Sequence, residues 1–209
     1  MIKIRDLKRS FIENDLEINC QNLTVDTGTT CGVCGKTASG KTLFSQVVSG
    51  VIKNYSGSIE IGMTELSSTY RKKIGYLPFK NILYNDMTLK EISVFLLSQY
   101  KVPESEFDLK LDWFSQFYDL RELVKRKISS LSGGQLQYIK YFISLIHSPS
   151  VLIIDEPFNG LGDESVDQVR SLFDEVNRKG VTILALSSHA EYLKKAAGSI
   201  RYITDGKIE

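Results

Sequence analysis

Two glycines, a lysine and a threonine stand at a spacing that suits phosphate binding. Four residues separate Gly35 from Gly40, and Lys41 and Thr42 follow directly. Glycines let the backbone curl so that successive N–H groups point at phosphate oxygens, and a helix start adds partial positive charge. Lys41 would neutralise the β- and γ-phosphates of a nucleotide, and the Thr42 hydroxyl would ligate Mg²⁺. The predicted phosphate-binding residues are Gly35, Lys36, Thr37, Ala38, Ser39, Gly40, Lys41 and Thr42.

Two acidic residues, Asp155 and Glu156, follow the apolar run VLII. They are expected at the carboxyl edge of a buried strand, which is where doubly wound sheets bind ligands. Asp155 would hold Mg²⁺, directly or through water, and Glu156 would polarise an attacking water as general base. The alternative, a pair of solvated acids at the start of a helix, suits Glu156 better than Asp155.

The elements around these residues are those of an α/β domain. Short β-like runs, IKI, LEINC, LTV and SIEIG, fill the first third, and a helix is predicted from Lys41 to about Val51. Helical spacing marks residues 89–100 and 111–127, where the aromatic cluster at Trp113 is interpreted as a packing face. The apolar runs VLIID and VTILALS bracket one more helical segment, which predicts βαβ units and a parallel sheet. We therefore expect one domain, residues 1–209, with a helical subdomain inserted at about residues 85–148.

The run LSGGQ is the most specific motif in the chain. Together with the Gly35 loop, VLIIDEP and a histidine after VTILALSS, it resembles the nucleotide-binding domain of ATP-binding cassette (ABC) proteins over essentially the whole length. The resemblance implies an α/β P-loop NTPase of ABC type, with a mostly parallel core sheet and an N-terminal antiparallel β part. The signature residues, which would form a second anion site at a helix start, are Leu131, Ser132, Gly133, Gly134 and Gln135.

The same resemblance implies an ATPase that uses ATP and Mg²⁺. Two cassettes would associate head to tail, as a homodimer or heterodimer, with each ATP between the Gly35 loop of one and the Ser132 loop of the other. Glu156 and His189 would be the catalytic residues, and Thr42 and Asp155 the metal ligands. Phe11, 24 residues before Gly35, would stack on adenine, although a core phenylalanine is a nearly equal interpretation.

Two positions depart from the family pattern. Phe79 stands where a glutamine is usual, and Asn81 would have to reach the site through a shifted loop to replace it. Gly162 stands where an aspartate is usual, with Asp163 one position late. Losing one preorganised polar contact costs on the order of 10²–10³ in rate, so slow hydrolysis is expected.

The composition excludes some classes of function and favours others. With 26 basic and 25 acidic residues and no basic run, nucleic acid is not an expected partner. No apolar run reaches the ~20 residues of a membrane span, and no signal-peptide core is present. We expect a cytoplasmic protein, peripheral on the inner face of the cell membrane, that docks a separately encoded transmembrane subunit through residues 79–88.

The chain ends four residues after Asp205, which favours an exporter over importers that carry a regulatory C-terminal domain. A soluble ABC ATPase, for example in cluster assembly, and a module that only binds ATP stay open as alternatives. The cargo is not encoded in these motifs.

Cys31 and Cys34 form a CxxC motif within the apolar run TTCGVC. On a strand, positions i and i+3 face opposite sides of the sheet, so one metal ion would not easily reach both. A buried structural role is therefore favoured over a zinc or dithiol site.

Overall fold

The computed structural model describes residues 1–11, 16–62, 64–65 and 70–209. Within these residues ten strands form one sheet, in the order β5-β4-β1-β2-β10-β9-β3-β8-β7-β6. The strands are β1 (Ile2–Phe11), β2 (Leu16–Val25), β3 (Thr30–Cys34), β4 (Ser56–Ile61), β5 (Thr64–Glu65), β6 (Ile74–Leu77), β7 (Val151–Asp155), β8 (Thr182–Ser187), β9 (Ser199–Thr204) and β10 (Lys207–Ile208).

Six α-helices and four short 3₁₀ helices complete the described structure. The α-helices are α1 (Lys41–Val48), α2 (Leu89–Tyr100), α3 (Glu106–Phe114), α4 (Gly133–Leu145), α5 (Val166–Arg178) and α6 (Ala190–Ala196). The 3₁₀ helices are η2 (Tyr70–Lys73), η3 (Arg121–Leu123), η4 (Ile128–Ser130) and η5 (Asp163–Ser165). None of the helices among the described residues is both long and apolar enough to cross a bilayer.

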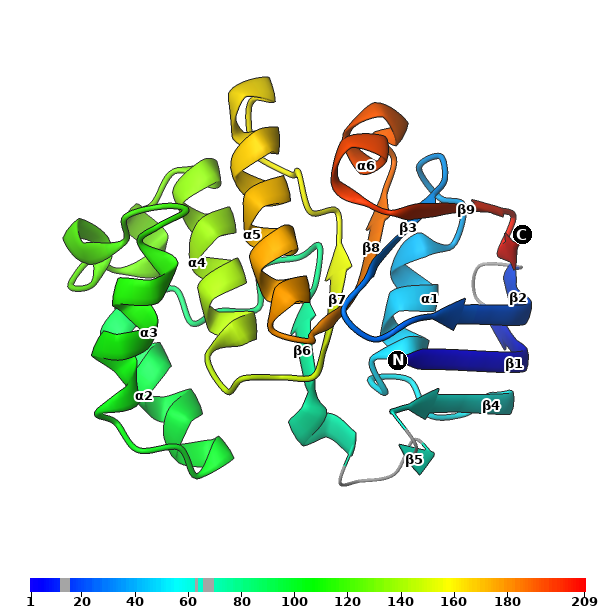
Figure 1. The fold of residues 1–209 in the computed structure, drawn as a ribbon, viewed down its shortest axis with the longest axis horizontal. Helices are drawn as coiled ribbons and strands as arrows, with labels where there is room; N and C mark the ends of the chain where they lie inside the picture. Colours follow the sequence, from blue (N-terminus) through cyan, green and yellow to red (C-terminus); the bar gives the residue numbers. More distant parts are fainter. Residues whose placement is uncertain (12–15, 63, 66–69) are drawn as a thin grey trace.

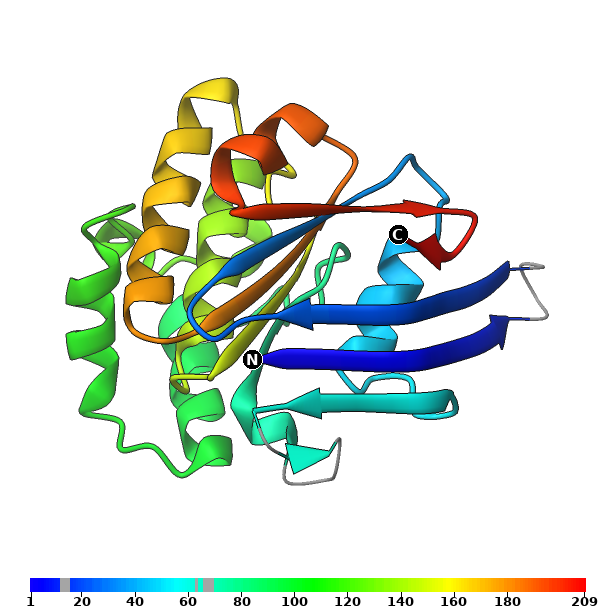
Figure 2. The ribbon, with the colours of Figure 1, turned by 45° about the vertical axis from the view of Figure 1, so that its right-hand side comes forward.

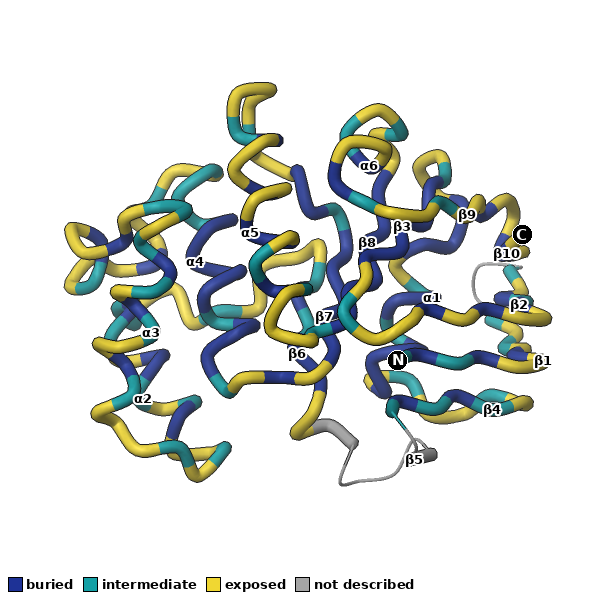
Figure 3. Tube along the Cα trace, viewed as in Figure 1, coloured by how far each residue is buried: buried dark blue, intermediate teal, exposed yellow. Residues whose placement is uncertain are grey.

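Strands β6, β7, β8, β3 and β9 pair in parallel and form the core of the α/β fold, as predicted. Helix α1 covers one face of this part of the sheet, and α4, α5 and α6 cover the other (Figure 1). The unbroken apolar run of β7 follows from this sandwich, because Val151 and Ile153 pack with α1 while Leu152 and Ile154 pack with α4 and α5. The tube in Figure 3 is accordingly buried along the central strands.

The N-terminal strands form an antiparallel half of the same sheet. Strand β1 pairs antiparallel with β2 on one side and β4 on the other. Figure 2 shows these strands extending as a wing away from α2 to α5, whereas α1 packs against them in one hydrophobic cluster. Strand β10 joins the wing to the core, since it pairs with β2 and with β9. The predicted antiparallel part is confirmed.

The inserted helices differ from the prediction in extent. Helix α2 spans the predicted residues 89–100 and starts with a capping box between Thr88 and Glu91. The helix predicted over residues 111–127 is wrong beyond Phe114, where α3 ends. The Asp119 carboxylate accepts hydrogen bonds from the Arg121 N–H and guanidinium, and such local side-chain bonds compete with helix formation.

Helix α1 is also shorter than predicted, because it ends at Val48 rather than near Val51. Gly50 adopts a φ of 76°, a left-handed conformation that ends helices. The helix therefore presents only two turns, with its first turn at the Gly35 loop.

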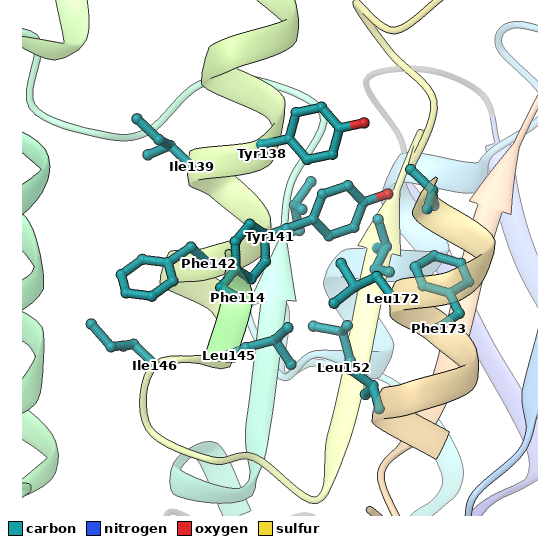
Figure 4. Close-up of a cluster of buried hydrophobic side chains, with 14 of the residues drawn as sticks. Phe114, Tyr138, Ile139, Tyr141, Phe142, Leu145, Ile146, Leu152, Leu172 and Phe173 are labelled. Atoms are coloured by element: carbon teal, nitrogen blue, oxygen red, sulfur yellow. The ribbon is translucent and has the colours of Figure 1, made fainter. Parts of the chain in front are cut away.

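The aromatic cluster of α3 is a packing face, as predicted. The Phe114 ring meets the Phe142 ring of α4 edge to face, with centroids 5.6 Å apart. Figure 4 shows Tyr141 of α4 pointing toward Leu172 and Phe173 of α5, whereas Phe142 lies on the other side of α4, beside Phe114. Helix α4 contacts β6 of the sheet, so it joins the predicted insert to the core in one hydrophobic cluster.

Candidate functional site

The loop between β3 and α1 has the shape that phosphate binding requires. Gly40 adopts a φ of 99°, a left-handed conformation that favours glycine. A side chain at Gly35 would meet the Ser39 Oγ at 2.5 Å and the Ile203 carbonyl oxygen at 2.6 Å. The turn after β9 supports the loop from below, because the Gly206 N–H donates to the Ser39 carbonyl at 2.9 Å. The backbone is thus closed tightly around the start of α1.

The Lys41 side chain is held in place by backbone carbonyl groups of this loop. Its Nζ donates to the carbonyl oxygens of Gly35 at 2.8 Å and Lys36 at 2.9 Å. The side chain is 6% exposed, and Nζ lies 3.5 Å from the Glu156 Oε1. The ammonium is therefore fixed between the loop and a carboxylate, at the place where phosphates would enter.

Glu156 is oriented by donors from the end of β8. The Ser187 hydroxyl donates to its Oε2 at 2.9 Å, and the Ser188 N–H donates to its Oε1 at 3.1 Å. Its backbone has a φ of 57°, uncommon for a residue other than glycine, and its N–H donates to the Leu186 carbonyl. Strained backbone at the end of a core strand is common at functional sites.

Asp155, the last residue of β7, has a carboxylate whose capacity to accept hydrogen bonds is unused among the described residues. It is fully buried, and neither of its carboxylate oxygens has a hydrogen-bond partner among the described residues. Burial raises the pKa of this carboxyl, while the Thr42 side chain and the Lys41 and Lys140 charges act against that rise. A buried carboxylate without partners, next to a threonine hydroxyl, is a hard oxygen donor set and fits Mg²⁺.

His189 stands before α6 and faces the same carboxylate. Its Nδ1 lies 4.0 Å from the Glu156 Oε2, and its side chain is 58% exposed. The ring stacks on Tyr192, with centroids 5.4 Å apart and an interplanar angle of 11°. Tyr192 therefore sets the orientation of the histidine at the mouth of the site.

These residues surround a cavity of about 600 Å³. Predicted residues that line it are Thr37, Ala38, Gly40, Lys41, Thr42, Glu156 and His189, with Phe79 at the edge. The sequence analysis missed Leu16, Leu43, Asn159 and Ser188. The other predicted residues of the loop and strand, Gly35, Lys36, Ser39 and Asp155, are not among those that line it.

Phe11 is not among the residues that line this cavity. Its ring lies 5.3 Å from the Arg9 guanidinium and packs against the cluster of the antiparallel strands. Its partner across the β1–β2 pair, Leu16, does line the cavity. Contact of Phe11 with adenine stays a prediction.

The structure gives no support to compensation of Phe79 by Asn81, and it shows a partner for Asp163 within the chain. The side-chain oxygen of Asn81 accepts from the Leu83 N–H at 3.1 Å, so Asn81 stabilises its own turn and does not line the cavity. Asp163 accepts a short hydrogen bond from the Tyr192 hydroxyl. Its carboxylate is therefore engaged within the chain rather than presented in place of the aspartate missing at Gly162.

The signature residues form a second, separate site at the start of α4. Ser132 caps the helix by accepting from the Gln135 N–H, and the Gln135 side chain accepts from the Ser132 N–H. A cavity of about 470 Å³ there is lined by Ser132, Gly133, Gly134 and Gln135, whereas Leu131 packs against the core. The two cavities share no lining residue. The Gly35 loop and the signature residues therefore belong to two separate cavities of this chain.

Helix α4 also contributes polar side chains that bond to the backbone near the site and that the sequence analysis missed. The Gln137 Nε2 donates to the Pro157 carbonyl at 2.9 Å, and the Tyr141 hydroxyl donates to the same oxygen at 2.8 Å. Lys140, 7% exposed, donates to the Phe79 carbonyl at 3.2 Å. The sequence signal for these contacts was the presence of polar residues such as Gln137 and Lys140 in an otherwise apolar helical segment, QLQYIKYFISLIHS.

The core sheet is parallel, a GxxxxGK[ST] loop precedes a helix, and a buried acid ends another parallel strand. Together these features define a P-loop nucleotide-binding protein. A family model narrows this class. The ABC transporter model matches residues 18–159, more than half of the chain, so the chain belongs to the ABC transporter family. The matched range contains the Gly35 loop, the signature and both acidic residues.

Named relatives cover nearly the whole chain. The chain is 26% identical over 206 residues to the uncharacterised ABC transporter ATP-binding protein MJ1023 of Methanocaldococcus jannaschii, covering 99% of the chain and 75% of the relative. It is 28% identical over 208 residues to the lantibiotic transport ATP-binding protein SrtF of Streptococcus pyogenes, covering 100% of the chain and 89% of SrtF. The dimeric structure of the ABC transporter cassette MJ0796 superposes with a TM-score of 0.86 at 20% identity, covering 100% of this chain and 97% of that one. The fold is thus that of an ATP-binding cassette.

Proposed function

We propose that the chain is the ATP-hydrolysing subunit of an ABC transporter, in which ATP is bound between two head-to-tail cassettes. The observation that carries this proposal is the separation of the two cavities: the Gly35 loop and the Ser132 loop share no lining residue within one chain. Each is an open half-site, so the second half is supplied by another cassette. The dimeric relative MJ0796 supports this arrangement.

Within such a site, this chain's residues have distinct tasks. Lys41 and the N–H groups at the start of α1 bind the β- and γ-phosphates, and Asp155 with Thr42 would hold Mg²⁺. When bound, Mg²⁺ would neutralise charge that develops on the phosphates. Glu156, oriented by Ser187 and Ser188, accepts the proton of the attacking water. His189 contacts the γ-phosphate from the mouth of the cavity.

We expect hydrolysis to be slow in the isolated subunit. Phe79 lines the cavity with a ring that neither donates nor accepts hydrogen bonds, and Asp163 is engaged by Tyr192. Two polar supports of the reaction are then missing, while the phosphate loop and both acids are present. A module that binds ATP with little turnover is the second candidate, and the same two observations favour it.

The transmembrane subunit is proposed to dock on residues 79–88 and the groove beside them. This groove of about 480 Å³ lies between the ends of β6, α1 and α2, and its lining includes Tyr76 and Leu96. Apolar side chains that line it are strongly exposed: Val51 57%, Ile82 69%, Tyr84 65% and Phe95 46%. Exposed apolar patches mark interaction sites. Leu83, in the same segment, is half-buried and packs against the core.

This docking would place the subunit in the cytoplasm, on the inner face of the cell membrane. Export stays the proposed direction, with which the lantibiotic transport relative SrtF is compatible. The membrane subunit sets the cargo, because the cassette supplies only the ATP chemistry.

A complementation assay tests the two-chain site. Lys41→Ala removes the phosphate-binding ammonium, and Ser132→Arg blocks the signature site, so each variant alone loses ATP hydrolysis. In a mixed head-to-tail dimer, one site combines the intact Lys41 of one chain with the intact Ser132 of the other. Mixing the two inactive variants therefore restores up to about half of the activity per mixed dimer. Ser132→Arg mixed with Glu156→Gln behaves in the same way, whereas Lys41→Ala mixed with Glu156→Gln restores none, because both of those changes lie in the half-site of the Gly35 loop.

Failure of the mixture to regain activity, with each variant folded and the wild type active, would refute a head-to-tail homodimer. If the wild type binds ATP but does not hydrolyse it, even with a membrane subunit present, the binding module is the correct function.

A further inference from the structure

Lys140 is a buried cation with no place in the chemistry described above. It lies in the middle of α4 and is 7% exposed, among apolar neighbours in sequence. Burying an ammonium costs free energy unless the group is paired. Burial accordingly lowers the pKa of Lys140 to about 8, although the charge of Asp155 acts in the opposite direction. Met or Leu at this position would avoid that cost.

The contacts of Lys140 connect two parts of the site. The Phe79 carbonyl, at 3.2 Å, is its one hydrogen-bond acceptor among the residues that the structure describes. Asp155 is the acidic group close enough to influence its charge, yet the two form no ion pair within 4.0 Å. The ammonium thus contacts the first residue of the exposed loop at residues 79–84, which also lines the ATP cavity, and lies within electrostatic range of Asp155.

The contact between Lys140 and Phe79 is important because the side chain of Phe79 cannot make a polar contact in the ATP site. The Phe79 backbone carbonyl instead accepts a hydrogen bond from Lys140, whose charge also interacts with that of Asp155. While Asp155 is uncompensated, Lys140 is attracted both to that carboxylate and to the Phe79 carbonyl. Once Asp155 takes part in binding a cation, its pull on Lys140 weakens, and the Phe79 carbonyl becomes the stronger partner.

We propose that Lys140 is a positioning residue that couples the charge state of Asp155 to the loop at residues 79–84, through its hydrogen bond to the Phe79 carbonyl. The inference rests on the proposed function, because it assigns a response to nucleotide and Mg²⁺ at that same site. It provides the chain with a link between the ATP site and its exposed apolar loop that does not need a polar side chain at position 79.

Two independent measurements test the proposal on the full chain with the nonhydrolysable analogue AMP-PNP. The first is hydrogen exchange of residues 79–87 with the analogue bound, before and after addition of Mg²⁺. Since the nucleotide is present in both states, its direct contact with Phe79 cancels. In the wild type, Mg²⁺ slows exchange of this segment by about threefold or more. In Lys140→Met this Mg²⁺-dependent change is lost, and in Lys140→Arg, which keeps charge and donor, at least half returns.

The second measurement is the affinity for Mg²⁺ in the presence of the analogue. Lys140→Met removes a positive charge near Asp155, so Mg²⁺ binds about two- to tenfold more tightly. A lysine with a purely structural role would give the reverse, because a loosened site binds Mg²⁺ more weakly. Lys80→Met is the matched control, since Lys80 is exposed on the same loop beside Phe79 and leaves the carbonyl contact intact. It changes neither measurement.

The outcomes separate this inference from the proposed function. If the wild type does not bind the analogue, the proposed function fails. If it binds, but Lys140→Met retains the Mg²⁺-dependent exchange difference or weakens Mg²⁺ binding, the role of Lys140 is refuted while the ATP site stands.

Discussion

At the scale of single residues, Asp155 shows a conflict between stability and binding. A carboxylate that is fully buried without hydrogen-bond partners among the described residues destabilises the nucleotide-free fold. Under the proposed function this cost is retained because those oxygens would hold Mg²⁺. Such sites are typically where activity opposes stability.

Asp155→Asn therefore raises the melting temperature of the nucleotide-free protein. Removing a charge that burial disfavours returns on the order of 1 kcal/mol, which corresponds to about 2–4 °C for a chain of this size. The same variant loses the additional stabilisation that ATP with Mg²⁺ gives the wild type. Differential scanning calorimetry with and without ligand measures both effects. Asp108→Asn, at an exposed position on α3, serves as the control and shifts neither value; a lower melting temperature in Asp155→Asn would contradict the argument.

Phe79→Gln is expected to raise the rate of ATP hydrolysis. Phe79 lines the ATP cavity with a side chain 45% exposed, so a glutamine there reaches the bound nucleotide and its water. A gain of about tenfold or more in kcat, with little change in KM, is expected for a restored polar contact. Phe95→Gln is the matched control, being 46% exposed but on α2 outside the cavity. An unchanged kcat in Phe79→Gln would show that position 79 does not limit the reaction.

Sequence patterns found the residues whose chemistry depends on local spacing. Gly40, Lys41 and Thr42 were predictable because the phosphate loop and helix start are contiguous in the chain. Lys140 and Tyr192 were not, because each acts on a partner from a distant segment: Lys140 on Phe79, and Tyr192 on His189 and Asp163. Contacts of that kind are decided by packing, which no spacing in a single sequence specifies.

At the scale of elements, α4 begins with the signature residues, and side chains from its middle hold the backbone next to Glu156 in place. The hydroxyl of Tyr141, fully buried, and the amide of Gln137 both donate to the Pro157 carbonyl, one residue after Glu156. Because the helix that begins with the signature residues also bonds to the backbone next to Glu156, we expect a displacement of α4 to move that backbone. A helix start at the signature was predicted from the sequence, but the hydrogen bonds of this helix to Pro157 were not.

Tyr141→Phe removes one of these two donors without changing the ring. The Pro157 carbonyl keeps its bond from Gln137, so the expected loss of unfolding free energy is about 1 kcal/mol, and kcat falls while nucleotide affinity is kept. Urea denaturation and steady-state kinetics measure the two effects. Tyr100→Phe removes a hydroxyl that makes no hydrogen bond to any described residue, and it leaves both values unchanged. A fall in affinity alone would place Tyr141 outside the positioning of Glu156.

At the scale of the whole molecule, His147 joins three parts of the fold. Its Nε2–H donates to the Ile74 carbonyl of β6 at 3.0 Å, and its ring stacks on Tyr100 at the end of α2, with centroids 3.9 Å apart. It follows α4 in sequence, so it connects the inserted helices to the edge strand of the sheet. The end of the helical insert was predicted near residue 148 from the sequence. The contacts that His147 makes across that boundary could be found only in the folded structure.

Burial, with the nearby charge of Lys110 as a smaller contribution, lowers the pKa of His147 to about 4. Because the folded-state pKa lies below the unfolded value near 6.5, the unfolded chain takes up this proton first as the pH falls. The associated stability is complete above about pH 6.5 and is lost progressively toward pH 4, by at most about 3 kcal/mol. The raised pKa of Asp155 works in the opposite direction, so the His147 contribution must be isolated by substitution.

His147→Gln keeps an amide donor for Ile74 and cannot take up the proton. Its unfolding free energy, measured by chemical denaturation from pH 7 to pH 4.5, is therefore expected to fall by about 1–3 kcal/mol less than that of the wild type. The chain has two histidines, and the second provides the control: the His189 side chain is 58% exposed, and His189→Gln keeps the wild-type pH dependence. Equal slopes for wild type and His147→Gln would mean that the joint between insert and sheet does not depend on a neutral His147. A steeper wild-type slope would identify this buried imidazole as the group whose protonation in acid loosens the helical insert from the sheet.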